Sequence, residues 1–433
     1  MYTETPLTMS TVEQQIAQRA SQITDEPLTN LHPFIDVAML HESFSMLNKN
    51  GAAGVDGQTW NEYNEQRGAN IPALLPAFKS GRYRAPHIRR TYIPKEDGRQ
   101  RPLGIPTIED KLLQTALTRV LSPVYEQLFY EESYGFRPGK SQHQALEEVF
   151  RQISFGGKRY VIDADMQNYF GTINHKTLRE LLDLRIRDKV VSKAIHKWLK
   201  AGILEEGQVS YPKEGTPQGG SISPLLSNIY LHYAVDEWFN EQIRPRLKAD
   251  AKLVRFADDF LLLFANRQDA ERVLKVLPQR LAKFGLTLHP EKTRLVNLEA
   301  GQSKPPTFDF LGFTHYMDRS RKGKRIVKRK TARKKLKASL MRVEQWIKIN
   351  RHQPIAWLMS RLNAKLRGHY SYYGITFNWW AIAVYHRRVE AILFKWLNRR
   401  GGRSSWSWSK INQLTHEWIP LARPKIHHSY VKP

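Results

Sequence analysis

The sequence predicts an α+β fold followed by a C-terminal α-helical segment, and three patterns support this fold class. Short apolar runs of strand length alternate with longer amphipathic runs through the first 316 residues. Two pairs of short runs have the form of antiparallel hairpins, one at 90–105 and one centred on Asp258. Beyond residue 319, apolar residues recur at helical spacing.

The elements are expected in the following order. Residues 1–50 are mainly helical, and a glycine-rich turn, NKNGAAGVDG, comes next. The hairpin at 90–105 turns around Asp97 and Gly98. TPQGGSISPLLSNIYLHYAVDEWF has the form of a glycine-marked loop that opens a long amphipathic helix. The other helices are expected at 107–128, 140–153, 176–202 and 268–284, and the other strands at 159–164 and 308–316.

The C-terminal segment is distinguished by its charge and by apolar stripes. Residues 319–433 carry 28 Lys and Arg against three acidic residues, so this segment holds +25 of the net charge of +27. A solvated face or an arm for anionic lipid would also be basic, but the abundance of tryptophan favours nucleic acid as the partner. The stripes are expected to form a helix-bundle core: Leu336, Leu340, Val343 and Ile347; Leu358, Leu362 and Leu366; and Val389, Ile392, Leu393 and Trp396.

Composition excludes several classes of function. The 433 residues include no cysteine, so disulfides, thiolate metal sites and cysteine nucleophiles are excluded. The N-terminal sequence MYTETPLTMSTVEQQ lacks the basic and apolar regions of a secretory signal, and the longest apolar run is too short to cross a bilayer. We therefore expect a cytoplasmic protein of two or three domains with no membrane partner.

Two adjacent carboxylates stand in the middle of an apolar run, LVRFADDFLLLFA, at residues 253–265. Unpaired like charges in a buried strand pair are costly. Asp258 and Asp259 therefore either occupy a hairpin turn, in which Asp is common, or have their charge cancelled by a divalent cation. These thirteen residues alone leave both interpretations open.

A second carboxylate cluster occurs in RYVIDADMQNYFGTINH. Asp163 and Asp165 project from one face of an apolar strand, because side chains alternate with period two. Phosphoryl transfer with two Mg²⁺ ions needs oxygen ligands from separate strands: one ion lowers the pKa of the attacking hydroxyl, and the other stabilises the leaving pyrophosphate. If the two strands adjoin, Asp165 and the Asp258–Asp259 pair would supply such a site.

Eight motifs, in order, resemble those of group II intron-type reverse transcriptases. FADD resembles the Tyr-x-Asp-Asp box of reverse transcriptases, DADMQNYF resembles their first metal-binding motif, and TPQGGSISPLLSNIYL is similar to the bacterial group II intron form of the motif between them. The others are GAAGVDG, IPKEDGRQRPLGIPTIEDKLLQ, SYGFRPGKSQHQAL, GLTLHPEKT and FDFLGF. The motifs cover about residues 30–316 and extend more loosely into LNAKLRGHYSYYG. The chain is thus identified as a bacterial group II intron-encoded reverse transcriptase/maturase.

This resemblance implies a right-hand polymerase fold, with fingers and an antiparallel palm sheet, followed by an α-helical thumb. The implied parts are an N-terminal extension at 1–50, fingers and palm at 51–316, a thumb or maturase domain X at 317–400, and a basic tail at 401–433 that is a candidate for nucleic-acid binding. The family's optional endonuclease domain would need more carboxylates and usually cysteine pairs, so an endonuclease-lacking type is expected.

The resemblance also implies roles for individual acidic residues. Asp165 and Asp258 match the family's principal ligands of the two Mg²⁺ ions, and Asp259 matches its supporting carboxylate. These three are therefore the expected catalytic residues. Asp163 is better interpreted as a hydrogen-bond acceptor at the end of a strand.

Five residues are implied in binding the incoming nucleotide. Lys95 and Arg101 match the fingers residues that grip the triphosphate, since fixed cations offset its charge. Phe170 matches the aromatic gate that excludes a 2′-hydroxyl, with core packing as its alternative. Gln218 lies in the loop under the templating base pair. Lys292 matches a lysine that would protonate pyrophosphate, with a surface helix lysine as its alternative.

A further set is implied in binding template and primer. Gly219 and Gly220 belong to the same loop as Gln218, where the absence of side chains allows close backbone approach. The basic run of the C-terminal segment supplies phosphate contacts, while its tyrosines and tryptophans are expected mostly to pack in the helix bundle. The candidate phosphate-binding residues are Lys328, Arg329, Lys330, Lys334 and Lys335.

The implied function is RNA-directed DNA polymerisation from an RNA template, a DNA primer and deoxynucleoside triphosphates, together with binding of group II intron RNA as a splicing maturase. Phe256 stands where the family usually has Tyr, and Gln167–Asn168 where Lys-Gly is common, but neither departure changes a metal ligand. The alternatives are a free-standing reverse transcriptase recruited for phage defence, CRISPR spacer capture or repair, and an RNA-binding splicing cofactor with a vestigial polymerase. The intact aspartates argue against the vestigial form.

Overall fold

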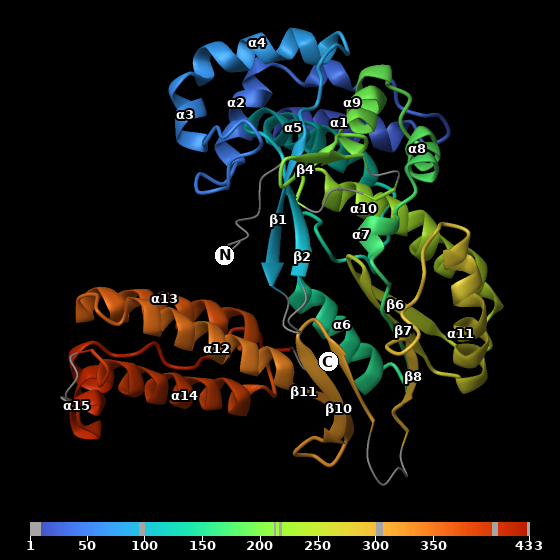
Figure 1. Ribbon diagram of the computed structural model, residues 1–433. Coiled ribbons are helices and arrows are strands. Elements are labelled where there is room, and N and C mark those ends of the chain that lie inside the picture. The colour runs from blue at the N-terminus through green and yellow to red at the C-terminus, as the bar shows by residue number, and fades with distance from the viewer. Residues whose placement is uncertain are drawn as a thin grey trace. The chain divides into compact units, whose positions relative to one another are not determined.

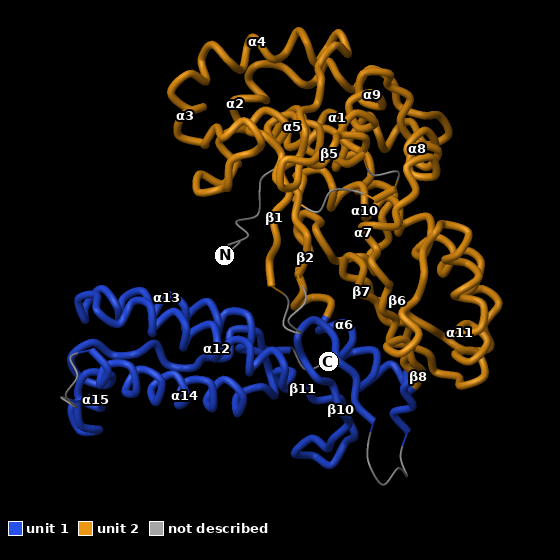
Figure 2. Tube along the Cα trace, in the orientation of Figure 1, with its two compact units in different colours: residues 1–3, 146–159, 296–433 blue, residues 4–145, 160–295 orange. Residues whose placement is uncertain are grey.

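The computed structural model describes residues 10–94, 100–211, 214–215, 219–299, 306–400 and 406–430. The chain forms two compact units (Figure 2). Among these residues, the larger unit contains 10–145 and 160–295, and the smaller unit contains 146–159 and 296–430. Mixed helices and mostly antiparallel sheets confirm the predicted α+β class.

A helical layer forms one part of the larger unit (Figure 1). Residues 10–46 do not form a separate extension, because Ile16 and Leu40 are fully buried in the same hydrophobic core as Leu113. The layer consists of α1 (Thr11–Gln22), η1 (His32–Phe34), α2 (Val37–Met46), α3 (Trp60–Glu65), α4 (Arg67–Lys79), α5 (Ile108–Tyr125), α8 (His175–Asp183) and α9 (Lys189–Leu199).

A small sheet with the strand order β2-β1-β4-β5 extends from this layer. Strands β1 (Ile88–Pro94) and β2 (Gln100–Ile105) pair antiparallel, which confirms the predicted hairpin, although its turn at Asp97–Gly98 lies outside the described residues. The strands β4 (Ile203–Glu205) and β5 (Gln208–Ser210) were not predicted. Three residues are too few to show an alternating pattern.

The second sheet of the larger unit has the order β6-β7-β3-β8. It consists of β6 (Ala251–Phe256), β7 (Asp259–Phe264), β3 (Tyr160–Ala164) and β8 (Arg294–Asn297). Strand β3 pairs antiparallel with β7, so the two strands that carry the carboxylate clusters do adjoin. Their apolar residues are buried on both faces, and α11 (Arg267–Ala282) packs against β3 and β7.

Two helical segments lie near this sheet in the chain. The short α7 (Tyr169–Thr172) follows β3, and α10 (Ser223–Leu231) continues into the π-helical turns η2 (His232–Asp236) and η3 (Trp238–Ile243) and the short η4 (Arg244–Arg246). The predicted glycine-marked loop and long helix at 216–239 are therefore confirmed from Gly219 onward, with a helix that widens after its ninth residue.

The smaller unit combines an antiparallel sheet with a helix bundle (Figure 1). The buried side chains of Val343, Leu362 and Val389 confirm the predicted apolar stripes. The sheet consists of β9 (Thr307–Phe310), β10 (Phe313–Arg319) and β11 (Arg325–Thr331), and the helices are α12 (Arg333–Asn350), α13 (Ile355–Tyr373), α14 (Trp379–Leu397), α15 (Trp408–Asn412) and η5 (Gln413–Trp418). The helix α6 (Gln142–Ser154) ends in this unit.

Two of the predicted boundaries differ from the structure. The boundary at 316/317 falls inside β10, because the basic run continues a β-hairpin instead of opening the helices. The segment 401–433 was expected to be an irregular basic tail. In its described part, Ile411, Leu414 and Leu421 are buried in the core of the helix bundle, so 406–430 is a structural part of that bundle.

Candidate active site

The carboxylate clusters meet at one end of the sheet β6-β7-β3-β8. In the pairing of β3 with β7, Asp163 lies opposite Leu261 and Ala164 opposite Phe260. Asp165 directly follows Ala164, and Asp259, the first residue of β7, directly precedes Phe260. Asp258 lies in the two-residue turn between β6 and β7. Three acidic residues from two chain segments therefore share one edge of the sheet.

The charges of these residues influence one another. Burial raises the pKa of Asp258, and the negative charge of Asp165 raises it further. The hydrogen bond to its own backbone amide and the positive charges of Arg101 and Arg255 act in the opposite direction. Asp165 of one motif and Arg101 of β2 therefore both lie within electrostatic reach of Asp258.

The segment 285–293 holds Asp165 from the other side. The carbonyl of Asp165 accepts a hydrogen bond from the backbone amide of His289 at 2.7 Å. The amide of Asp165 donates to Oγ1 of Thr293 at 3.4 Å. Nζ of Lys292 donates to Oδ2 of Asp165 at 2.9 Å, and both side chains are about half exposed. The motif GLTLHPEKT thus lies directly beside DADM.

The donor set of this edge suits a hard divalent cation. All three candidate ligands are carboxylates, and the like charges of Asp165 and Asp258 raise the energy of the ionised state, which a cation would offset. In the described part of the chain, no three acidic or histidine side chains already surround one point as a metal cage.

Asp163 differs from Asp165 in its surroundings. Its side chain lies 3.7 Å from Nε of Arg294, measured from Oδ2, and its backbone is inside the β3–β7 ladder. Asp163 therefore lies in the β3 ladder beside Arg294.

The predicted nucleotide-binding residues are placed as follows. Arg101 is exposed on β2 and acts electrostatically on Asp258. Phe170, in α7, is half-buried, packs against the core of the larger unit and contacts the ring of Tyr169 edge-on at 5.1 Å between centroids. Lys95 and Gln218 lie outside the described residues.

Gly219 is required by a backbone contact within the protein, and Gly220 lies close to a side chain. Gly219 has φ +120°, and a Cβ atom there would lie 2.4 Å from the carbonyl oxygen of Gly104 in β2. A Cβ atom on Gly220 would lie 2.8 Å from Oε1 of Gln114. Within the protein, these two glycines approach β2 and α5.

Arg329 is not placed for the predicted phosphate contact. It is fully buried in the smaller unit, where Nη1 donates to the carbonyl of Leu146 at 3.1 Å and to the hydroxyl of Tyr430. Its guanidinium also lies over the rings of Phe150 and Tyr430. The run Lys328-Arg329-Lys330 is part of strand β11, so alternate side chains point to opposite faces and the middle one enters the core.

The other predicted cations are more accessible. Lys328 forms an ion pair with Asp318 at 2.9 Å, and Lys330 is exposed beside the ring of Tyr316. Lys334 is exposed and Lys335 half-buried in the first turn of α12, which contains no acidic residue and no side-chain cap. Cations at a helix N-terminus oppose the helix dipole, so this turn is locally unfavourable unless an anion is nearby.

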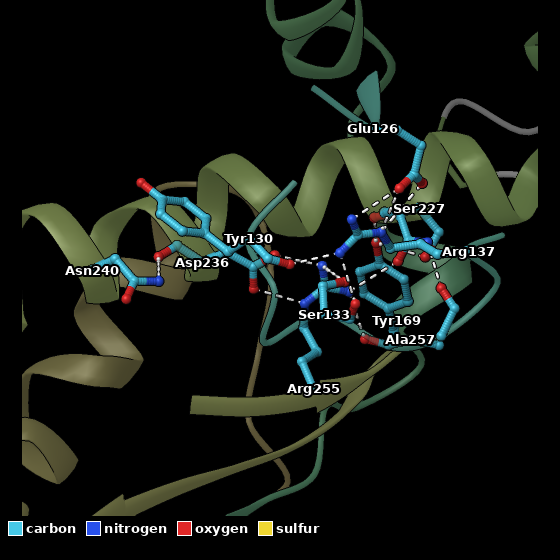
Figure 3. A network of polar contacts seen from close by, with 12 residues as sticks. Glu126, Tyr130, Ser133, Arg137, Tyr169, Ser227, Asp236, Asn240, Arg255 and Ala257 are labelled. Carbon is cyan, nitrogen blue, oxygen red and sulfur yellow. Dashed lines mark hydrogen bonds and ion pairs between the residues drawn. The ribbon is translucent and has the colours of Figure 1, made fainter. Parts of the chain in front are cut away.

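One group beside the site was not predicted. Arg255, the single charged residue within the apolar stretch LVRFA, is fully buried and bonded to Asp236, Ser133 and the carbonyl of Ala257 (Figure 3). It also bonds to Asn228. The signal that would have revealed it is the presence of a charge at an inward position of an otherwise apolar strand.

Acidic residues at one edge of an antiparallel sheet, beside a lysine and an arginine, are typical of metal-dependent nucleotidyl-transferring enzymes. Residues 93–315 match the family model described as reverse transcriptase (RNA-dependent DNA polymerase). The chain therefore belongs to the reverse transcriptase family.

Curated relatives agree with this assignment. The chain is 38% identical over 230 residues to the group II intron-encoded protein LtrA of Lactococcus lactis subsp. cremoris, covering 52% of this chain and 37% of LtrA. It is 33% identical over 306 residues to protein YkfC of Escherichia coli K12, covering 62% of this chain and 77% of YkfC. It is 37% identical over 207 residues to a 91 kDa protein in the cob intron of Schizosaccharomyces pombe, covering 46% of this chain and 25% of that protein.

The match spans less than two fifths of the length of LtrA.

Among the described helices, none is both long enough and apolar enough to cross a membrane.

Proposed function

We propose that this protein is an RNA-directed DNA polymerase that extends a DNA primer on an RNA template. The observation that carries the proposal is the meeting of Asp165 and Asp258, from separate motifs of a reverse transcriptase chain, at one sheet edge where their charges interact. In this proposal the sheet β6-β7-β3-β8 is the palm, β1 and β2 belong to the fingers, and α12–α14 form the thumb.

Asp165, Asp258 and Asp259 would hold two Mg²⁺ ions, as the donor chemistry of the site allows. When bound, the ions would supply activation of the primer 3′-hydroxyl and stabilisation of the leaving pyrophosphate. The protein's own cations have separate roles. Arg101 neutralises the triphosphate, and Lys292, beside Asp165, donates a proton to the leaving pyrophosphate.

The smaller unit would bind the nucleic acid backbone. It carries most of the net positive charge, and the first turn of α12 brings Lys334 and Lys335 together without an acidic residue. Because such contacts are made to phosphates, they position the template and primer without reading their sequence.

The proposal is tested with single aspartate substitutions. Asp165→Asn and Asp258→Asn should each reduce Mg²⁺-dependent DNA synthesis on an RNA template to background, with RNA affinity little changed. Asp163→Asn is the matched control, because it removes a charge from strand β3, two residues before Asp165, and should retain most activity. Normal synthesis by Asp165→Asn or Asp258→Asn would refute the assignment.

A second candidate function is splicing assistance as a maturase. It is favoured by the similarity to LtrA, whose name describes it as encoded by a group II intron. Intron ribozyme sequence in the DNA around this reading frame, and faster splicing of that intron in the presence of the protein, are the expected results. Flanking DNA without such sequence would favour a free-standing reverse transcriptase.

A further inference from the structure

Arg255 and Asp236 form a fully buried ion pair beneath the candidate active site. Arg255 belongs to β6 and Asp236 to η2, and both side chains have no exposed surface. Nε of Arg255 donates to Oδ1 of Asp236 at 2.7 Å, and Nη2 donates to Oδ2 at 2.5 Å. A guanidinium removed from water in this way is tolerated only when its donors are satisfied.

Every donor of this guanidinium has a partner, and the partners come from four chain segments (Figure 3). Besides Asp236, Nη1 donates to Oδ1 of Asn228 in α10 at 3.0 Å, and Nη2 donates to Oγ of Ser133 at 2.7 Å. The remaining Nη1 donor is bonded to the carbonyl of Ala257 at 3.1 Å. Arg255 therefore links the Asp258 turn to a helix, a π-helical turn and the loop at 132–136.

The backbone contacts of the same loop reinforce this link. The amide of Arg255 donates to the carbonyl of Glu132 at 2.9 Å, and the amide of Tyr134 donates to the carbonyl of Arg255 at 2.8 Å. Nδ2 of Asn228 donates to the carbonyl of Gly135 at 2.7 Å. A Cβ atom on Gly135 would lie 2.3 Å from the backbone nitrogen of Ala257, so loop and turn are in direct contact.

The turn that these contacts fix is conformationally strained. Ala257 has φ +56°, a left-handed conformation that costs an alanine about 1 kcal/mol and persists only when the surroundings enforce it. Its carbonyl, which Arg255 holds, belongs to the peptide that leads directly into Asp258. A change in that peptide would redirect the Asp258 carboxylate.

We propose that Arg255 is a positioning residue, which holds the Ala257–Asp258 peptide in the conformation that presents Asp258 to the catalytic metal. The inference rests on the proposed function for the identity of the metal site. A positioning role for Arg255 and a purely structural ion pair have different consequences. Loss of positioning alters metal binding and turnover, whereas loss of a structural ion pair lowers stability alone.

The first test compares two buried arginines. Arg255→Lys keeps the charge that Asp236 requires, but a single ammonium group cannot replace five directed donors. Arg185→Lys is the matched control, because Arg185 is also buried in the larger unit. In the described part of the chain, its guanidinium donates to the backbone carbonyls of Ala20, Ile23 and Glu26. Thermal unfolding of both variants measures the structural cost.

Two readouts then separate positioning from stability. Mn²⁺ binding in the absence of nucleic acid, followed by electron paramagnetic resonance, should be weakened roughly 10-fold or more in Arg255→Lys and in Asp258→Asn, but not in Arg185→Lys. Single-turnover incorporation at saturating substrate should fall roughly 10²-fold in Arg255→Lys, with the template-primer Kd unchanged. If Arg255→Lys fails to fold, Ser133→Ala provides a second variant, because it removes the acceptor of one Nη2 donor of Arg255. It should shift both readouts in the same direction, but by less.

The outcomes distinguish this inference from the proposed function. Arg255→Lys with a lowered unfolding temperature but wild-type metal affinity and turnover would overturn the positioning role. Wild-type protein that binds Mn²⁺ in an Arg255-dependent way yet makes no DNA on any template would overturn the polymerase assignment and leave the positioning role standing.

Discussion

Lys292 and Asp165, 127 positions apart in the chain, form an ion pair in which Nζ lies 2.9 Å from Oδ2. This contact places the one flexible cation of the motif GLTLHPEKT directly against a candidate metal ligand. The side chain of Lys292 is about half exposed, so it is free to reorient toward a bound phosphate.

Replacing Lys292 by Met should slow nucleotide incorporation by roughly 10²-fold, because a donor for the leaving pyrophosphate is lost. Rapid-quench measurement of a single incorporation at saturating deoxynucleotide reports this rate. Lys283→Met, which removes an exposed lysine after α11, is the control and should be close to wild type. Equal rates for the two variants would reduce Lys292 to a surface ion pair.

Substitution of Phe170 by Ala tests its assignment as the sugar gate. The expected result is a rise of roughly 10–100-fold in ribonucleotide relative to deoxyribonucleotide incorporation, because the ring would no longer exclude a 2′-hydroxyl. Primer extension with each nucleotide type measures the ratio. Phe155→Ala, at an exposed ring in the smaller unit, controls for loss of a phenylalanine. A folded Phe170→Ala variant with unchanged sugar preference would show that the ring serves packing alone.

The accessible cations of the smaller unit should determine the salt dependence of RNA binding. Changing Lys328, Lys330, Lys334 and Lys335 together to Gln should flatten the slope of log K against log salt by about 3, since each phosphate contact contributes about 0.7–0.9. Binding titrations between 50 and 200 mM salt measure it.

A control with the same charge change isolates the position of these lysines. Lys176, Lys200, Lys275 and Lys283 are exposed in the larger unit, and their joint change to Gln should leave the slope nearly unchanged. If both quadruple variants have the same slope, the basic strand and helix turn do not form the phosphate contacts.

His232 should make the protein sensitive to acid. Burial, together with the charges of Arg255 and Arg137, lowers the pKa of His232 to about 3, and its Nδ1 has no hydrogen-bond partner in the described structure. Between pH 3 and about pH 6.5, His232 is protonated in the unfolded chain but neutral in the folded chain. The contribution of neutral His232 to the free energy of unfolding is therefore fully present above pH 6.5 and is lost as the pH falls. The loss reaches about 2 kcal/mol at pH 5.

Replacing His232 by Phe should therefore reduce the difference in unfolding free energy between pH 7.5 and pH 5. The new ring would lie among the rings that already surround the histidine, those of Phe129, Tyr130 and Tyr233. Urea unfolding at the two pH values gives the comparison, and His352→Phe, at an exposed histidine, is the control. An unchanged pH dependence would mean that another group titrates.

Gly219 and Gly57 allow a clean comparison of backbone strain and contact. Both have positive φ, but a Cβ atom on Gly57 would meet nothing within 4 Å, whereas one on Gly219 would lie 2.4 Å from the carbonyl oxygen of Gly104. Each Ala variant should lose about 1 kcal/mol through its conformation. Gly219→Ala should lose more stability and also polymerase activity, because β2 must shift; equal losses in thermal unfolding would argue against the contact.

Local sequence patterns predicted the elements that carry the candidate site. Alternating apolar residues placed Asp163 on a strand and the pair Asp258–Asp259 in a hairpin, as the structure has them, whereas Asp165, expected on the same strand as Asp163, directly follows the last residue of β3. Neither local pattern predicted that β3 and β7 are neighbours in the sheet. Pairing between strands about 100 positions apart depends on how the whole core packs. The pairing of Ala164 with Phe260 decided it.

The sequence by itself therefore determined which residue types occur, at what spacing and in what order, and these were sufficient for the fold class and the family. Only the tertiary structure decided which face of each element is covered. Lys328 and Lys330 remain outside while Arg329 enters the core, and Arg255, one charge in an apolar strand, lies beneath the Asp258 turn. The physical reason is that periodicity fixes which side chains share a face, whereas burial and hydrogen-bond partners are set by distant segments that pack against that face.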